Sequence, residues 1–187
     1  MDRVNELLEM NPVIAAVRDV AQMEMALQSP VEVIFLMTGD IFSVRPCVEK
    51  TKDYGKSIFL HIDLIKGVAN DKEGIKYLAR EVKPNGVVTT KNHLIQAAKR
   101  EGLIAVQHLF LIDTHAFDSG IRNVLELQPD AVELMPGLMP RVIREFSEAV
   151  TYPIITAGLI KDKREIQEAL NAGARGVAVG TRELWEE

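Results

Sequence analysis

The sequence contains only one cysteine, Cys47, among its 187 residues. A single thiol excludes an intrachain disulfide framework and a cysteine-based structural zinc site, so we interpret Cys47 as a small buried hydrophobe. The sequence also lacks a run of about 18 consecutive apolar residues, which a membrane-spanning helix would need. Its first residues, MDRVNELLEMNP, carry charges at four of the first nine positions and do not resemble a signal peptide. We therefore expect a cytoplasmic protein with no membrane partner.

An excess of positive charge is missing as well. The chain has 22 lysine and arginine residues against 27 acidic residues, which gives a formal net charge of -5. Any contact with nucleic acid would therefore depend on a local basic patch rather than on the whole surface. Basic residues do gather at Lys161, Lys163 and Arg164, with Arg175 and Arg182 nearby in sequence. Aromatic residues make up only 5% of the chain and do not interleave with these positions, so no base-stacking platform is expected.

Sequence motifs for several common chemistries are absent. There is no Walker loop, no GxGxxG stretch and no nucleophile elbow, which argues against P-loop nucleotide sites, Rossmann dinucleotide sites and α/β-hydrolases. His61, Asp63, His108 and Glu133 lie at or near the ends of predicted strands and could converge. Their spacing matches no known metal-binding signature, however. We therefore expect neither a cofactor nor a metal ion.

Eight apolar runs of strand length are present, separated by segments with helical spacing. The runs are mostly unbroken rather than alternating, which is typical of parallel strands buried on both faces. Eight strand–helix units predict an α/β fold, a small closed (β/α)8 barrel of the TIM type. Because such barrels usually have about 250 residues, some helices must be short or missing here. The alternative, an open flavodoxin-like sheet, would need fewer strands. The runs are residues 13–17, 31–37, 58–62, 86–89, 104–110, 131–135, 153–156 and 176–179.

The helical segments carry recognisable end signals. Asn92 and Asp162 are predicted N-caps of the helices that follow them. We expect residues 1–11 to form an extra N-terminal helix that packs beside the final strand and covers part of the gap left by a short last helix. The whole chain, residues 1–187, is expected to form a single barrel domain. The clearest amphipathic helices are predicted over residues 72–81, 92–101, 141–150 and 162–171.

The two last predicted strands both finish on glycine, in PIITAGLI and GVAVGT. In a parallel barrel the working residues lie where strands end, and the tips of strands seven and eight commonly hold a phosphate group. Backbone amides near Gly158 and Gly180, together with the hydroxyl of Thr181, can supply that site without a charged side chain. The alternative is that both glycines only make turns.

Other strand ends carry polar groups that allow more than one interpretation. His61 and Asp63 share a strand face and could form an acid–base or hydroxyl-binding pair, or a hydrogen-bonded polar cap on the core. Lys91 could bind an anionic ligand or, in an aldolase-like enzyme, form a Schiff base. Glu133 lies in an otherwise apolar strand, so it either binds ligand hydroxyls or pairs with a neighbouring donor such as His108.

Several segments together resemble the glycerol uptake operon antiterminator family. They include HIDLIKG, VVTTKNHLIQAAK, LFLIDTHAF, PDAVELMPGLMPRVI, PIITAGLI and EALNAGARGVAVGT, and the similarity runs in order from Asn11 to Trp185. The resemblance implies a small barrel that binds glycerol 3-phosphate, or a similar phosphorylated polyol, and then the leader mRNA of glycerol-use operons. The chain departs from the family where His108 replaces an arginine and Ala157 replaces a glycine. The motif residues that the resemblance assigns to the ligand site are His61, Asp63, Lys91, Asp113, Glu133, Pro136, Gly137, Gly158, Gly180 and Thr181.

The resemblance predicts a transcription antiterminator with an RNA-binding role rather than an enzyme. The alternative is a phosphate-binding barrel enzyme, an isomerase, aldolase or lyase that acts on a triose-phosphate-like substrate. A third hypothesis is a barrel that keeps the anion site and has lost its regulatory partner. The negative net charge opposes RNA binding, because RNA affinity depends largely on phosphate neutralisation. A homo-oligomer that gathers basic patches would offset this opposition.

Overall fold

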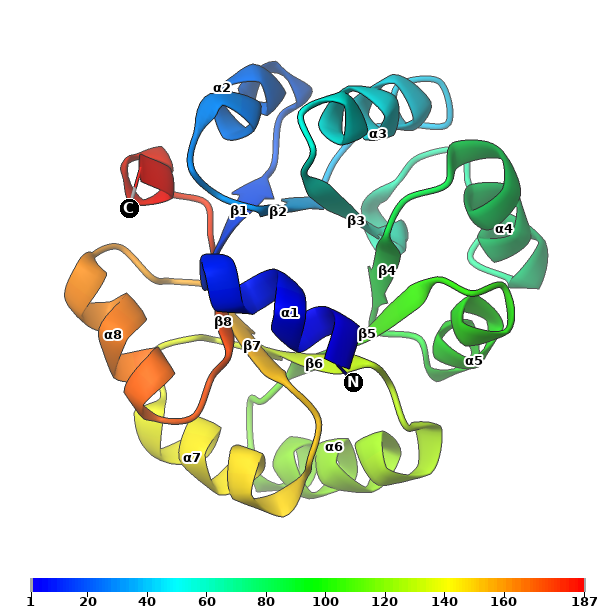
Figure 1. Ribbon diagram of the computed structural model, residues 1–187. Helices are drawn as coiled ribbons and strands as arrows, with labels where there is room; N and C mark the ends of the chain where they lie inside the picture. The colour runs from blue at the N-terminus through cyan, green and yellow to red at the C-terminus, as the bar shows by residue number, and fades with distance from the viewer. Residues whose placement is uncertain (1, 187) are drawn as a thin grey trace.

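Residues 2–186 are described by the structure, a computed structural model, and they contain eight strands that close into a barrel (Figure 1). Neighbouring strands pair in parallel and in chain order. The ring is completed by β8 and β1, where Val13 lies opposite Val177. The predicted TIM-type (β/α)8 barrel is confirmed, and the open-sheet alternative is wrong. The strands are β1 (Val13–Val17), β2 (Val33–Leu36), β3 (Ser57–His61), β4 (Gly86–Thr89), β5 (Ile104–Phe110), β6 (Ala131–Met135), β7 (Ile154–Ala157) and β8 (Gly176–Val179).

Helices surround the barrel, and several are short, as the chain length predicted (Figure 1). Both α2 and α4 have only 6 residues, and β8 is followed by a 3-10 helix of 5 residues. Within residues 2–186, no helix has the length and apolar character needed to cross a membrane. The helices are α1 (Asp2–Met10), η1 (Val20–Gln22), α2 (Met23–Gln28), α3 (Val44–Asp53), η2 (Ile62–Leu64), α4 (Lys72–Tyr77), η3 (Leu78–Val82), α5 (Asn92–Arg100), α6 (Thr114–Leu127), α7 (Pro140–Ala149), α8 (Lys163–Asn171) and η4 (Arg182–Glu186).

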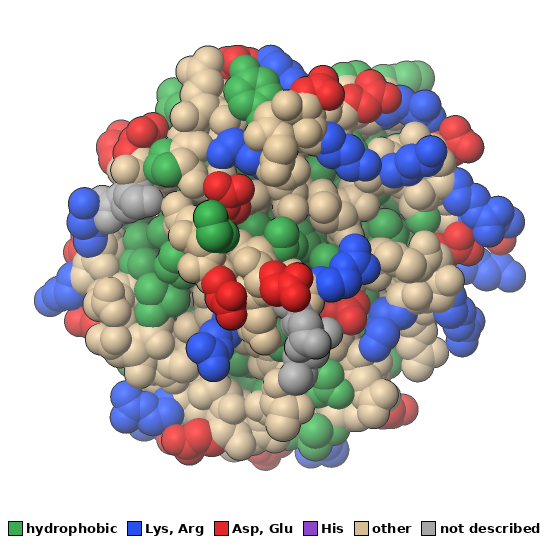
Figure 2. Space-filling model, in the orientation of Figure 1, with side chains coloured by type: hydrophobic (Ala, Val, Ile, Leu, Met, Phe, Trp, Pro, Cys, Tyr) green, Lys and Arg blue, Asp and Glu red, His purple; other side chains and the backbone are tan. Residues whose placement is uncertain are grey.

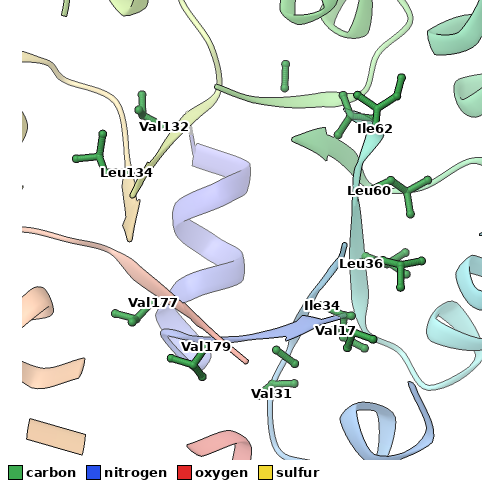
Figure 3. Close-up of a cluster of buried hydrophobic side chains, with 14 of the residues drawn as sticks. Val17, Val31, Ile34, Leu36, Leu60, Ile62, Val132, Leu134, Val177 and Val179 are labelled. Carbon is green, nitrogen blue, oxygen red and sulfur yellow. The ribbon is translucent and has the colours of Figure 1, made fainter. Parts of the chain in front are cut away.

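Strand side chains form two apolar cores, one on each side of the sheet. Leu36, Leu60 and Val179 point away from the barrel axis and belong to the core between sheet and helices (Figure 3). Phe35 and Phe59 belong to the second core, inside the barrel, where their ring centroids lie 5.4 Å apart. Because strand side chains alternate between the two faces, a sheet covered on both faces needs unbroken apolar runs. The pattern in the sequence therefore has a direct structural cause.

The predicted N-cap is correct for one helix and one residue too late for the other. Asp162 caps α8, and its carboxylate accepts a hydrogen bond from the Glu165 amide at 2.9 Å. The N-cap of α5 is Lys91 rather than Asn92, which is already helical. The Lys91 amide donates to Thr89 Oγ1 at 3.1 Å, which holds Lys91 in an extended conformation before the helix begins.

The segment 72–81 does not form one regular helix. The α-helical part, α4, ends at Tyr77, and a wider π-helical segment, η3, continues to Val82. Lys83 then adopts a left-handed conformation with φ of 60°. Pro84 follows directly and disfavours the helical conformation of the residue before it, which explains why the helix stops there.

The N-terminal helix α1 lies across one end of the barrel (Figure 1). Val4 and Leu8 lie one turn apart and are buried against the inward-facing apolar side chains. Gly176 leaves room for this contact, because a Cβ there would lie 3.0 Å from Leu8 Cδ2. The helix α1 therefore contacts the start of the final strand, as expected, but its apolar face covers the apolar opening at the barrel end rather than a gap in the outer ring of helices. Beside β8, the buried Trp185 of η4 donates its indole N–H to the Val179 carbonyl at 2.8 Å.

Candidate ligand-binding site

A pocket of about 340 Å³ lies at the carboxyl ends of β7 and β8, between those strand tips and the end of β1. We call it the rim pocket. Arg18 and Lys161 supply positive charge to its wall, and within residues 2–186 no carboxylate side chain lines it. Such a wall favours an anion over a neutral ligand. The rim pocket is lined by Arg18, Gly158, Leu159, Ile160, Lys161, Ala178, Val179, Gly180 and Thr181.

The two strand-tip glycines serve different purposes in the rim pocket. Gly158 has φ of 84°, a conformation that side chains disfavour. Gly180 instead keeps the space beside Arg18 open: a Cβ there would lie 3.7 Å from the Arg18 guanidinium carbon, an ordinary van der Waals distance, so the packing of the chain itself does not require glycine at this position. Leu159, next to Gly158, also has a positive φ, 67°, and is exposed. A non-glycine residue in this conformation costs of order 1–3 kcal/mol, and such strain clusters at ligand sites.

Arg18 and Lys161 are the charged rim-pocket residues that the predicted ligand set omitted, and Arg18 shows how barrel closure adds such a residue. It directly follows β1, which ends at Val17, so it is the first residue beyond a strand tip. Barrel closure places β1 beside β8 and brings Arg18 to Gly180 across more than 160 positions of sequence. Arg18 could have been identified from two facts together: it is a basic residue at the end of a predicted strand, and in a closed barrel the first strand lies beside the last.

Pro136 and Gly137 lie next to the rim pocket rather than in its wall. The peptide bond between Met135 and Pro136 is cis. The Gly137 amide donates to the Gly158 carbonyl at 3.0 Å, and a Cβ at Gly137 would come within 2.6 Å of Ile160 Cδ1. Gly137 therefore packs against the β7 tip that carries Gly158.

Asp63 and Lys91 form an ion pair at the tips of β3 and β4, with 2.8 Å between Asp63 Oδ1 and Lys91 Nζ. The same carboxylate accepts hydrogen bonds from Thr89 Oγ1 and from both the amide and the hydroxyl of Thr90, each at 2.8 Å. Burial alone would raise the pKa of Asp63, but the hydrogen bonds from Lys91 and the two threonines outweigh it and lower the pKa. Asp63 thus links the end of β3 to the end of β4 and holds the Lys91 ammonium in an ion pair.

His61 and Asp63 do not form the predicted pair. The strand ends at His61, and residues 62–64 form a 3-10 turn, so the strand alternation that would align the two side chains stops there. His61 lies inside the barrel, near Glu133, whereas Asp63 turns to Lys91. The expectation of a shared face was therefore wrong for a local reason, the turn that follows the strand.

The interior of the barrel holds a buried polar cluster, His61, His108 and Glu133, which we call the barrel cluster. Side-chain exposure is 6%, 5% and 1% for these residues, in that order. His108 Nδ1 is hydrogen-bonded to Glu133 Oε2, and His61 Nε2 lies 3.6 Å from the same oxygen. The predicted pairing of Glu133 with His108 is therefore present.

Burial and the neighbouring ionisable groups shift the pKa values of the barrel cluster in opposite directions. Burial lowers the pKa of His61, and the nearby Glu133 carboxylate only partly opposes that shift. Burial alone would raise the pKa of Glu133, but the two imidazoles reverse the effect and lower it. The shifts thus favour the ionised form of Glu133 and disfavour the protonated form of His61.

Asp113 lies apart from the rim pocket. It is exposed and caps α6, accepting a hydrogen bond from the Ala116 amide at 2.7 Å. It borders a different pocket, formed by the β5–α6 loop and α7. The structure therefore supports a helix-capping role for this predicted ligand residue.

Residues 13–185 match the profile of the family described as glycerol-3-phosphate responsive antiterminator. The chain belongs to this family. A curated relative of this chain, YgcP of Escherichia coli K12, is described as uncharacterized and is 34% identical over 179 residues. The matched region covers 96% of this chain and 94% of YgcP.

Two solved structures of antiterminator proteins share the whole fold. A glycerol uptake operon antiterminator regulatory protein from Listeria monocytogenes has a TM-score of 0.91 and 29% identity, over 94% of this chain and 95% of that chain. A glycerol uptake operon antiterminator-related protein from Thermotoga maritima has a TM-score of 0.84 and 28% identity, over 95% of this chain and 99% of that chain. Solved enzyme structures match at lower identity, which shows the fold alone.

Proposed function

We propose that this antiterminator-family protein binds glycerol 3-phosphate and, in response, the leader mRNA of glycerol-use operons, where it prevents premature termination. The observation that carries the proposal is the rim pocket, whose wall combines Arg18 and Lys161 with glycine strand tips. Barrels of this kind commonly hold phosphate at these two strand tips. The family description names the same ligand. The proposed role would place the protein in the cytoplasm, with nascent mRNA.

The phosphate end of the ligand would occupy the rim pocket. Backbone amides near Gly158 and Gly180 would donate to the phosphate oxygens, together with the hydroxyl of Thr181. The Arg18 guanidinium can add charge-assisted hydrogen bonds, which are shorter and about twice as strong as neutral ones. The phosphate would therefore be bound both by neutral donors, the backbone amides and the Thr181 hydroxyl, and by the charged Arg18 guanidinium.

The glycerol end would turn toward the centre of the barrel mouth, where Asp63, His61 and Glu133 are the proposed hydroxyl partners. Asp63 already accepts hydrogen bonds from Lys91 and Thr90, so a ligand hydroxyl would exchange with one of these. Such an exchange would loosen one strand-tip contact while it makes another. A ligand shifts a conformational equilibrium only by its difference in affinity for the two states, and this exchange offers such a difference.

RNA binding would need a basic surface that the whole-molecule charge of -5 does not provide. Figure 2 views the α1 end of the barrel, where acidic and basic side chains are intermixed. That face is therefore a poor candidate for RNA. We propose instead that basic residues near the rim, such as Lys161 and Arg164, contribute, and that a homo-oligomer brings two such patches together.

Calorimetry tests the proposal directly. The purified protein is titrated with glycerol 3-phosphate, with glycerol and inorganic phosphate as matched controls, and the titration is repeated with a leader RNA present. We expect binding of glycerol 3-phosphate without turnover, and tighter RNA binding when the ligand is present, since linkage is reciprocal. Absence of heat at millimolar glycerol 3-phosphate would contradict the sensing role.

The same samples separate the alternatives. Ligand binding with no effect on RNA affinity would support a barrel that has lost its regulatory partner. Conversion of a triose phosphate by the wild type, abolished in Asp63→Asn, would support the enzyme alternative. The ion pair of Lys91 with Asp63 favours the regulator, because an engaged ammonium is not a free amine nucleophile.

A further inference from the structure

The barrel cluster, two of whose members are proposed above as hydroxyl partners of the ligand, also gathers three side chains of metal-ligand type inside the barrel. His61 ends β3, His108 lies in β5, and Glu133 lies opposite His108 in β6. All three point into the barrel, and the imidazole rings of the two histidines meet edge to face, with centroids 5.6 Å apart. Three strands thus direct two imidazoles and one carboxylate at one point.

The donor atoms are close enough to share a metal ion. One donor atom from each residue lies within 4.8 Å of the others, and His61 Nε2 is 3.6 Å from Glu133 Oε2. Metal–ligand distances of about 2.0–2.2 Å in a tetrahedral site put neighbouring donor atoms about 3.4 Å apart. Closing the cluster around an ion therefore requires side-chain shifts of order 1 Å.

His61 provides a second and independent observation. Its Nε2 atom is buried and has no hydrogen-bond partner in the part of the chain that the structure describes, although the residue is only 5% exposed. A buried polar atom without a partner has lost its hydrogen bonds to water and gained none in return, which destabilises the folded state. A metal ion would use this nitrogen as a ligand and remove that destabilisation.

Charge balance favours a dication. Glu133 is only 1% exposed, and a buried carboxylate needs a compensating positive charge. Two neutral imidazoles and one carboxylate leave a bound dication with a net charge of +1, and this set of two histidines and one glutamate is a known zinc set. Imidazole nitrogen also favours zinc over magnesium and calcium, which prefer oxygen ligands only.

We propose that His61, His108 and Glu133 bind one Zn²⁺ ion inside the barrel, through His61 Nε2, His108 Nδ1 and a Glu133 carboxylate oxygen. Three protein ligands leave one coordination position open, for water or for an oxygen atom of a ligand that enters the mouth. The ion would hold β3, β5 and β6 together below the rim. It would also replace the hydrogen bond between His108 and Glu133.

Zinc titration of the metal-free protein tests this site. The protein is stripped with a chelator, dialysed, and titrated with Zn²⁺ in competition with a chromophoric chelator, and Co²⁺ is added separately to record its visible spectrum. We expect one ion per chain and the intense absorption of four-coordinate cobalt. Absence of 1:1 binding by the wild type would overturn the proposal without the use of any variant.

Variants then assign the ligands. Glu133→Gln and His61→Gln should each weaken Zn²⁺ binding by more than about 100-fold. Mutation of residues that only hydrogen-bond to metal ligands typically costs about 10–100-fold, and loss of a ligand should cost more. His115→Gln, which changes an exposed histidine of α6, is the matched control and should bind as the wild type does. Equal affinity in His61→Gln and His115→Gln would overturn the assignment. Because zinc alone is the probe, failure here would leave the proposed phosphate site unaffected.

Discussion

The substitution Gly180→Ala gives the sharpest test of the rim pocket, because it separates ligand binding from folding. A Cβ at this position would lie 3.7 Å from the Arg18 guanidinium carbon and 3.9 Å from the Ala16 carbonyl oxygen. Both are ordinary van der Waals contacts, and Gly180 is not among the glycines with positive φ. We therefore expect the free energy of unfolding to stay within about 0.5 kcal/mol of the wild type.

The effect on affinity should be much larger than the effect on stability. The added methyl group would stand between the β8 backbone and Arg18, in the space assigned to a phosphate oxygen. Losing one hydrogen bond to a charged group costs about 1.5–3 kcal/mol. At about 1.4 kcal/mol for each factor of ten, this predicts a 10- to 100-fold weaker affinity for glycerol 3-phosphate.

Calorimetry and thermal unfolding measure the two quantities on the same samples, and Gly158→Ala is the contrasting variant. Gly158 has φ of 84°, and its Cβ would face Met135 at 3.4 Å rather than the rim pocket. Gly158→Ala should therefore lose about 1 kcal/mol of stability through backbone strain. If Gly180→Ala were folded and bound glycerol 3-phosphate as tightly as the wild type, the rim pocket would not be the phosphate site.

Two further predictions test the roles of the acidic residues. Asp113→Ala should cost about 1 kcal/mol of stability, because α6 loses its N-cap. Calorimetry should show unchanged affinity for glycerol 3-phosphate. A large loss of affinity would show that Asp113 contributes to ligand binding. Because the folded-state pKa of Asp63 lies below its usual value of 3.8, its ionised form contributes stability above that value, and this contribution is lost as the pH falls through the lower folded-state pKa. Urea unfolding at about pH 5 and about pH 3 should show a smaller pH dependence for Asp63→Asn than for the wild type; an identical dependence in the two proteins would contradict the hydrogen-bonded role of Asp63.

The order and number of strands could be predicted because burial on both faces leaves a strong local signal. Runs such as 131–135 are apolar on both faces except at Glu133, since one face meets the helices and the other fills the barrel. The cap at Asp162 was also predictable, because an N-cap depends on residues three positions apart. The N-terminal helix was predicted from the same kind of pattern, but its position was not.

The candidate site was predicted in part. Gly158, Gly180 and Thr181 line one pocket, as their places at the last two strand tips indicated. The 3-10 turn after β3 separates the side chains of Asp63 and His61, and the strand pattern does not reveal that turn. The Asp113 carboxylate caps helix α6 instead of lining the rim pocket. Arg18 could be found only by combining its strand-end position with closure of the barrel.

The sequence by itself determined the elements of this protein and their order, because apolar periodicity, caps and strand-end glycines act over a few residues. It also determined the family, through segments that run along nearly the whole chain. Only the tertiary structure decided where α1 lies and which side chains meet. Contacts between Arg18 and Gly180, or between His61 and Glu133, join residues far apart in the chain, and their geometry depends on closure of the barrel and on the direction of each side chain.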